Sequence, residues 1–416
     1  MKKVAAFLLV QFCAVSLFCQ NLHFAQKTID TLTSQYFSGR GAVNDGEKKA
    51  AHFIANQFEE IGLKTIKNSF LQEFNAPINT FPKEMKVTID GKKLTPGVDF
   101  IVDPSTNQTE ESFELFWLPK KHASNQDKLH QLANEGAFTN KFVVLDLKNA
   151  EKEIINSLKT NTINAAGIIF ITEKLTHSLS SKVRKHPTLY VKKGVIATNS
   201  QRISVKIDQQ FKPNYQSQNV IGCVQGTQFP DSIILLSAHY DHLGMMGENT
   251  YFPGANDNAS GVAMLLDMAN YYAKNPPKKS IIFIAFGAEE LGLVGSKYFV
   301  NHPTVPLHNI NFVFNMDLMG TGSEGGMIVN GKVFEQHFNK LDSINQKESY
   351  LPMLKKRGKA ANSDHYWFSE NGIPSFFIYL MGGISAYHDV DDVAKTLPLT
   401  KYEASFRLIC NFIDEL

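Results

Sequence analysis

The chain has 416 residues, which is enough for two or three domains of ordinary size or for one large domain that carries an insertion. Its composition is 43% hydrophobic, 11% aromatic and 20% charged, which excludes a disordered, collagen-like or disulfide-framed protein. Its 42 Lys and Arg residues against 40 Asp and Glu residues give a formal net charge of only +2. The chain therefore lacks the basic excess typical of proteins that bind nucleic acid or anionic membranes.

The first twenty residues predict an exported protein. Two lysines precede a nearly uninterrupted apolar run from Val4 to Phe18, which is typical of a signal peptide. The run is shorter than the about 20 apolar residues that a membrane-spanning helix needs, and polar sequence follows it directly. We expect cleavage near Cys19 or Gln20 and a periplasmic or extracellular protein without a stable membrane span. Lipid attachment at Cys19 is disfavoured, because bulky Phe18 stands where such sites need a small residue.

Cysteine usage adds little to the fold prediction. Beyond the predicted leader the chain contains only Cys223 and Cys410, which is enough for one disulfide at most. Their spacing says nothing about whether they pair. We expect both to be buried thiols.

The first half of the chain alternates regular segments with stretches of little periodicity. Apolar residues at three- and four-residue steps predict an amphipathic helix over 45–62. A helix-like stretch over 151–159 lies between two strand-like runs, which is consistent with a βαβ unit; these runs are KFVVLDLK and AAGIIFITEK. From 75 to 141 and from 182 to 213, proline and polar or charged residues interrupt the pattern.

Beyond Asn219 the sequence alternates strongly between apolar strands and helices. The expected strands are NVIGCV, SIILLSAH, SIIFIAFG, INFVFNMDL and IPSFFIYL. The expected helices cover 259–274, 295–301, 333–346, 364–370 and 402–415. Strands that are apolar on both faces and are followed by helices imply an α/β fold, with a central mixed, mostly parallel sheet sandwiched by helices.

Imidazole and carboxylate side chains follow the strands of this second half. They stand in the motifs SAHYDHLG, GANDNASG, GAEELG, NMDLMG and AYHD. In chain order the candidates are His239, Asp241, Asp257, Glu289, Glu290, Asp317, Tyr387 and His388. Because ligands of such sheets bind outside the carboxyl ends of the strands, we expect these side chains to converge on one site.

The candidate residues are of the type that binds zinc. Imidazole and carboxylate groups are zinc ligands, and no thiolate is among the candidates. Alone, Asp257 would be read as a helix cap, and Glu289 and Glu290 as an acidic pair at a helix start. Those readings give no reason for all the candidates to follow strands of one sheet. One metal needs about three protein ligands, so five of these candidates fit two metals if one carboxylate bridges; the five are His239, Asp257, Glu290, Asp317 and His388.

The same motifs, with SDHYWF, resemble those of the co-catalytic di-zinc aminopeptidases. That family includes the bacterial leucyl aminopeptidases, the glutamate carboxypeptidases and relatives of the glutaminyl cyclases. The resemblance is close over 219–392, and the segment YFSGRGAVNDGEKKAAHFIANQFEEIGLK is similar to the amino-terminal helix region of these enzymes. The stretch between the two is similar to a protease-associated-type insertion. An arginine that precedes the SDH motif in some relatives is replaced by Asn362, so its substrate contact is not transferred.

This resemblance implies a domain organisation. The signal peptide would cover 1–20, and the catalytic domain would be assembled from 21–75 and 214–416. A smaller α/β domain would be inserted over 76–213.

The resemblance also implies a role for each ligand. Asp257 would bridge two zinc ions. His239 and Asp317 would complete one site, and Glu290 and His388 would complete the other. Two such metals, about 3.5 to 4 Å apart, can share a water, lower its pKa and polarise the scissile carbonyl.

Three further residues receive roles from the resemblance. Glu289 would be the general base that takes a proton from the shared water and passes it to the leaving amine. Asp241 would accept a hydrogen bond from the far nitrogen of the His239 ring. Tyr387 would donate its hydroxyl to the developing oxyanion.

We therefore expect an exported zinc aminopeptidase that acts on peptides with a free amino terminus. Three alternatives stay open. A glutaminyl cyclase is disfavoured by Tyr387, where cyclases tend to have tryptophan, and a carboxypeptidase by the absence of an arginine cluster near the motifs. A receptor-like binding protein is disfavoured because such relatives have typically lost ligands, whereas this chain retains all five and the base. The sequence does not indicate the oligomeric state.

Overall fold

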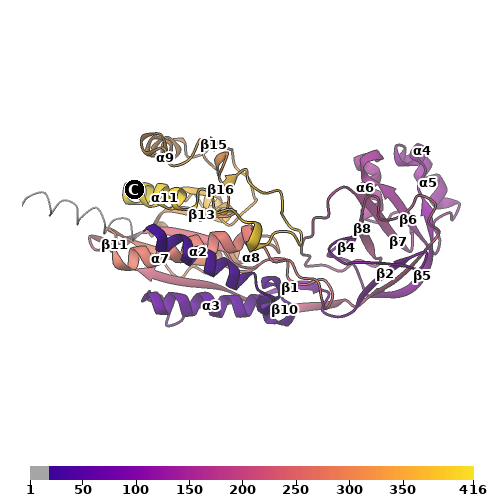
Figure 1. The fold of residues 1–416 in the computed structure, drawn as a ribbon, viewed down its shortest axis with the longest axis horizontal. Helices are drawn as coiled ribbons and strands as arrows, with labels where there is room; N and C mark the ends of the chain where they lie inside the picture. Colours follow the sequence, from indigo (N-terminus) through magenta and orange to yellow (C-terminus); the bar gives the residue numbers. More distant parts are fainter. Residues whose placement is uncertain (1–17) are drawn as a thin grey trace, which may run out of the picture.

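Two eight-stranded mixed sheets organise the chain, and Figure 1 shows them at opposite ends of an elongated molecule. The structure is a computed structural model that describes residues 18–416. The predicted signal peptide falls almost entirely on residues 1–17, outside the described part of the chain. Within the described part, none of the helices combines the length and the apolar character that crossing a bilayer requires.

The first sheet is the central sheet expected from the sequence. Its order is β1 (Leu71–Thr80), β10 (Gln210–Val224), β12 (Lys279–Phe286), β11 (Phe229–His239), β13 (Ile310–Met316), β16 (Ser375–Met381), β14 (Gly325–Val329) and β15 (Leu354–Lys356). The four central strands pair in parallel, whereas β1, β10 and β14 run antiparallel to neighbours. The predicted mixed, mostly parallel sheet is therefore confirmed.

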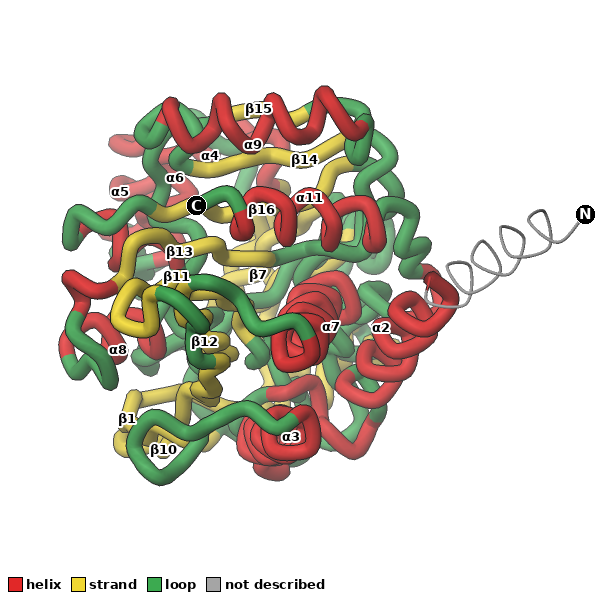
Figure 2. The backbone as a smooth tube through the Cα atoms, turned by 90° about the vertical axis from the view of Figure 1, so that its left-hand side faces the viewer, coloured by secondary structure: helices red, strands yellow, loops and turns green. Residues whose placement is uncertain are grey.

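Helices cover both faces of this sheet, as the view from one end of the molecule in Figure 2 shows. One face is covered by α2 (Phe18–Leu32), α3 (Gly46–Ile61), α7 (Ser260–Lys274), α9 (Glu335–Glu348) and α11 (Tyr402–Asp414). The other face is covered by α8 (Val294–Asn301) and α10 (His365–Glu370). Alternate residues of β11 enter the two cores, with Ile234 and Leu236 on one side and Ile233 and Leu235 on the other. This two-sided burial explains why the strand has an uninterrupted apolar run at its centre, over 233–236.

The second sheet lies entirely between β1 and β10 in the chain. Its order is β3 (Lys92–Leu94), β2 (Met85–Ile89), β9 (Arg202–Ile207), β5 (Thr109–Trp117), β6 (Lys141–Asp146), β7 (Gly167–Thr172), β8 (Thr188–Lys192) and β4 (Phe100–Val102). Its helices are α4 (Lys120–Ala123), α5 (Gln126–Asn134) and α6 (Lys152–Lys159). We call the part of the chain from β2 to β9 the inserted domain.

Most strands of the inserted domain were not expected from the sequence. Only β6 and β7 match predicted strands, and the stretches around them that seemed irregular contain six more. The burial of β2 and β9 alternates along each strand, with lysines on the open face. Such half-buried strands carry only two or three apolar residues each, so their period-two signal is weak. In the first sheet, the short strands β14 and β15 were likewise not predicted.

The strands β1 and β10 carry the chain into and out of the inserted domain side by side. They pair antiparallel from Leu71 opposite Val220 to Thr80 opposite Gln210, with one irregularity between Ala76 and Ile78. The long ribbon visible in Figure 1 therefore joins the two parts of the molecule.

The two cysteines of the described chain are free thiols. Cys410 on α11 is buried, as expected. Cys223 on β10 is partly exposed, so the prediction of a buried thiol is wrong there, because the strand end it occupies is only partly covered. Burial raises the pKa of both thiols.

Asp267 is a buried carboxyl on α7 that should make stability depend on pH. It is 2% exposed, its Oδ2 has no hydrogen-bond partner among the described residues, and burial raises its pKa to about 7. The unfolded chain releases this proton near the ordinary pKa of about 3.9, so between that pH and 7 the folded state binds one extra proton. This group's contribution to stability therefore falls as the pH rises through that interval and is constant above it.

We expect Asp267→Asn to stabilise the protein at pH 8 by about 2–4 kcal/mol and to have almost no effect at pH 4. The check is urea unfolding of metal-free protein at both pH values. Asp30→Asn, at an exposed position of α2, is the matched control and should change neither. An equal effect of Asp267→Asn at both pH values would contradict the burial argument.

Candidate metal centre

The five predicted ligands meet at the carboxyl ends of the central strands. His239 ends β11, Asp317 follows β13, and Glu290 stands in the turn after β12. Asp257 lies in a π-helical turn, Ala255–Ala259, directly before α7, and the peptide bond after it is cis. His388 comes from the loop after β16. The structure thus brings together side chains from five separate segments, as the strand-end argument predicts.

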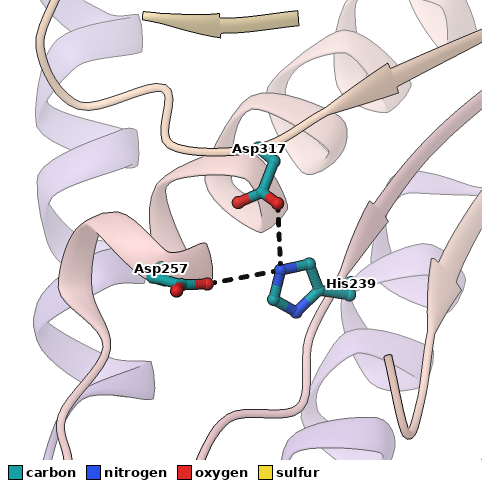
Figure 3. Close-up of side chains that lie close together, drawn as sticks. All are labelled: His239, Asp257 and Asp317. Atoms are coloured by element: carbon teal, nitrogen blue, oxygen red, sulfur yellow. Dashed lines mark hydrogen bonds and ion pairs between the residues drawn. The ribbon is translucent and has the colours of Figure 1, made fainter. Parts of the chain in front are cut away.

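Figure 3 shows the first group of these side chains. The Nε2 atom of His239 lies 3.3 Å from Asp257 Oδ1 and 3.3 Å from Asp317 Oδ2. All three side chains are buried, and Asp317 Oδ1 has no hydrogen-bond partner within the described chain. One imidazole nitrogen and two carboxylates around a common point form a donor set suited to zinc.

The second group uses the other oxygen of the same aspartate. His388 Nε2 lies 3.0 Å from Asp257 Oδ2 and 3.2 Å from Glu290 Oε2. The two oxygens of Asp257 therefore face two different histidines, His239 and His388. This is the arrangement in which one carboxylate can bridge two metal ions.

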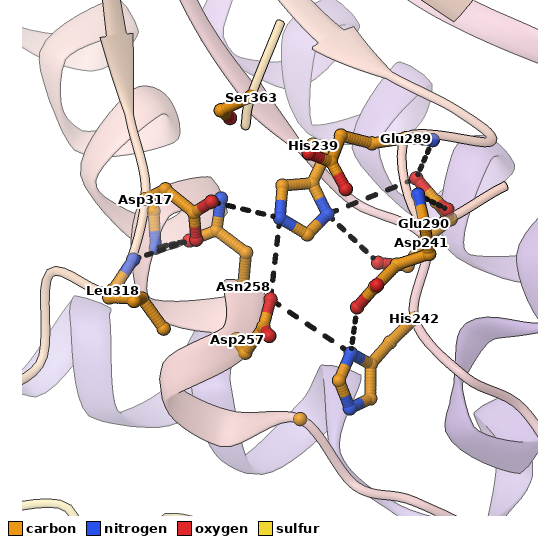
Figure 4. A network of polar contacts seen from close by, with 12 residues as sticks. His239, Asp241, His242, Asp257, Asn258, Glu289, Glu290, Asp317, Leu318 and Ser363 are labelled. Atoms are coloured by element: carbon orange, nitrogen blue, oxygen red, sulfur yellow. Dashed lines mark hydrogen bonds and ion pairs between the residues drawn. The ribbon is translucent and has the colours of Figure 1, made fainter. Parts of the chain in front are cut away.

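A third histidine belongs to this cluster and was not predicted. His242 is buried, and its Nδ1 lies 2.9 Å from Glu290 Oε1 and 4.0 Å from Asp257 Oδ1, as Figure 4 shows. Its ring could complete a metal-binding group with these two carboxylates. Burial lowers the pKa of His242, which favours the neutral ring. The available signal was the second histidine of SAHYDHLG, three residues after His239.

Asp241 supports the site in a different way from the one expected. The atom nearest to His239 Nδ1 is the main-chain carbonyl of Asp241, at 3.1 Å, whereas its carboxylate lies at 3.9 Å. The carboxylate instead accepts hydrogen bonds from the main-chain N–H groups of Glu289 (3.0 Å) and Glu290 (3.1 Å). The predicted carboxylate contact is therefore corrected to a carbonyl contact, because two donors of the next turn occupy the carboxylate.

Arg40 and Asp392 hold the loops that carry the ligands, and neither was predicted. Asp392 accepts from the N–H groups of Asn256 (2.8 Å) and Asp257 (3.0 Å). Arg40 is fully buried and donates to five main-chain carbonyls, those of Leu32, Tyr240, Pro253, Gly254 and Asp257. It comes from the motif YFSGRG, whose Gly39 has φ +65° and approaches Gly244 too closely for a side chain.

The two predicted catalytic residues lie at the edge of the ligand cluster. Burial raises the pKa of Glu289 well above its ordinary value, the charge on His239 lowers it, and the carboxylate of Asp364 raises it further. Figure 4 shows Glu289 beside His239. Tyr387 is 44% exposed, and its ring stacks on that of His388 with centroids 4.0 Å apart. Glu289 thus faces the buried ligands, while Tyr387 lies between the cluster and solvent.

Buried histidines and carboxylates at the carboxyl end of a helix-covered mixed sheet define an α/β protein of the zinc-peptidase type. The model of peptidase family M28 matches residues 219–413. Aminopeptidase YwaD of Bacillus subtilis is 30% identical over 378 residues, which cover 84% of this chain and 74% of that protein. The chain therefore belongs to peptidase family M28. The predicted family is confirmed, and so is the predicted class of enzyme, a metallo-exopeptidase.

Solved structures show the same fold over almost the whole chain. A zinc aminopeptidase from Bacillus subtilis is similar with a TM-score of 0.72 and 24% identity, over 94% of each chain. An aminopeptidase from Aneurinibacillus sp. strain AM-1 is similar with a TM-score of 0.66 and 20% identity, over 94% of this chain and 92% of that one. The predicted fold class is confirmed by these likenesses.

Proposed function

We propose that the chain is an exported aminopeptidase that binds two zinc ions and removes amino-terminal residues from peptides. The observation that carries the proposal is Asp257, whose two oxygens face His239 on one side and His388 on the other, at 3.3 and 3.0 Å. The related Bacillus subtilis proteins are named as aminopeptidases, which supports the same activity here. Export rests on the amino-terminal sequence alone.

The donor chemistry of the site fits this metal. His239 and Asp317 would hold one ion, Glu290 and His388 the other, and Asp257 both. When bound, zinc supplies Lewis-acid polarisation of the scissile carbonyl and lowers the pKa of water in the site. Asp317 Oδ1 has no hydrogen-bond partner among the described residues, and it belongs to a group of three buried side chains that could hold a metal ion, so a bound cation would supply the missing partner.

Glu289 is the proposed general base. Asp241 fixes the main chain of both Glu289 and Glu290 through two N–H contacts. With its main chain fixed, Glu290 turns to His242 and His388, which leaves the preceding carboxylate free for proton transfer. Burial raises the pKa of Glu289, which makes this carboxylate a better proton acceptor, and it can return the proton to the leaving amine.

The donor groups of the site suit a substrate with a free amino group. The ligand cluster contains three carboxylates, and Glu289 stands beside it. A free amino group could take an open coordination position or pair with a neighbouring carboxylate, whereas an acetylated amine could do neither. Tyr387, partly exposed beside His388, is the proposed donor to the oxyanion.

Metal analysis and anilide hydrolysis test this proposal together. We expect about two zinc ions per chain, cleavage of amino-acid anilides, and loss of cleavage when the amine is acetylated. Removal of the metal with a chelator should abolish turnover, and added zinc should restore it. Equal cleavage of acetylated anilides would overturn the aminopeptidase activity, and ring closure of an amino-terminal glutamine would favour a cyclase instead.

A further inference from the structure

The inserted domain packs against the loops that carry part of the metal centre. After β11 the chain runs into the hydrophobic core of the inserted domain, where Leu243, Met246 and Phe252 are buried. Val390, two residues after His388, packs against the same core. Two ligand-bearing loops of the first sheet therefore fold against the second sheet.

One histidine of the inserted domain is joined to a predicted ligand by two hydrogen bonds. His177 lies in the connection between β7 and β8, and its N–H donates to the carbonyl of His388 over 2.9 Å. In return, the carbonyl of His177 lies 3.0 Å from Nδ1 of the His388 ring, which places the ring hydrogen on Nδ1. That tautomer leaves Nε2 with its lone pair toward Asp257 and Glu290, as a metal ligand requires.

Three further contacts tie the connection between β7 and β8 to the ligand-bearing loops. Lys174 Nζ donates to the carbonyl of Ser385 over 2.7 Å and lies 3.2 Å from Asp389 Oδ2. The ring of His177 stacks on that of Phe252, with centroids 4.8 Å apart. These contacts flank His388 on both sides in the chain.

His388 itself has a backbone conformation that needs such support. Its φ is +53°, in the left-handed region that is unfavourable for a residue with a side chain. Such a conformation persists when surrounding contacts determine it, and here the contacts come from the inserted domain.

The other half of the metal centre is held by the first sheet. His239 ends β11 and its Nδ1 faces the carbonyl of Asp241. Asp317 follows β13, and its N–H donates to the carbonyl of Ile378 on β16. The two halves therefore depend on different parts of the molecule.

We propose that residues 173–179 of the inserted domain are a positioning element for the metal site of Asp257, Glu290 and His388, and not for the site of Asp257, His239 and Asp317. The inference rests on the proposed function, because it requires two metal sites. The inserted domain would then help to build the metal centre, and its displacement would weaken metal binding at one of the two sites only.

The test compares metal binding by the wild type with that by the double variant Lys174→Met, His177→Ala. Metal-free protein is titrated with zinc in competition with a chelator, and with cobalt(II) followed by its visible absorption. We expect two binding steps in the wild type, of which the variant weakens one by about 10-fold or more and leaves the other unchanged. The unchanged step shows that the variant is folded.

Two matched variants sharpen the comparison. Lys206→Met removes a lysine of the inserted domain that pairs with Glu84 and Glu110, each at 3.2 Å and outside 173–179, and should change neither step. His388→Ala alone should abolish the binding step that the double variant weakens. The triple variant, which combines His388→Ala with Lys174→Met and His177→Ala, should then show no further loss of metal binding.

The possible failures are distinguishable. A wild type that binds a single ion would overturn the two-ion proposal and this inference with it. Two wild-type steps that the double variant leaves alone, or weakens equally, would overturn the inference and leave the proposed function standing.

Discussion

The Glu289→Gln variant should keep its zinc, and its kcat on amino-acid anilides should fall by about 10²- to 10⁴-fold. A decrease of this size is the usual contribution of a general base. Glutamine has the size of glutamate but cannot accept the proton. Its main-chain N–H, held by Asp241, is unchanged by the substitution. The measurement is kcat and KM together with zinc content on the same preparation.

The adjacent residue provides a contrasting control. Glu290→Gln alters a side chain whose two oxygens contact His242 and His388, so it should lower zinc content as well as turnover. Glu348→Gln, at an exposed position of α9, should change neither. A Glu289→Gln enzyme that retains turnover would show that another group moves the proton.

The sequence predicts the first sheet well because its physical signal is local. Strands such as β11 and β12 are buried on both faces over much of their length, so they carry continuous apolar runs, over 233–236 and 281–286. His239 and Asp317 stand at the ends of β11 and β13, and the other three ligands follow in the connections after β11, β12 and β16. Their convergence follows from the parallel order of these strands. The five ligands could therefore be predicted from the sequence.

The residues that sequence reasoning missed act through main-chain contacts or through distant segments. Arg40 binds carbonyl groups, which every residue has, so no pattern in the sequence marks its partners. Asp392 binds N–H groups of a loop about 135 positions earlier in the chain. His242 and His239 stand in the same motif, but their rings contact different carboxylates, those of Glu290 and Asp317. The sequence does not indicate which carboxylate each ring contacts. These roles are decided by tertiary packing.

The buried guanidinium of Arg40 gives rise to the second large effect that we expect. Arg40→Met should destabilise the metal-free protein by about 3–5 kcal/mol, because five carbonyl groups lose a donor and a buried charge is removed. Burial lowers the pKa of Arg40 to about 10, while Asp257, Asp392 and other carboxylates oppose that change. The side chain is thus charged at neutral pH and balances the acidic cluster.

Zinc should restore part of this loss, because the bound ions supply positive charge to the same carboxylates and stabilise the folded state that binds them. Arg40→Lys keeps the charge but cannot reach five carbonyls at once, so it should fall between the wild type and Arg40→Met. Urea unfolding with and without zinc measures both effects, and Arg357→Met, at an exposed position, is the control. If zinc stabilised the wild type and Arg40→Met by the same free energy, the charge-balancing role of Arg40 would be wrong, and only its structural contacts would remain.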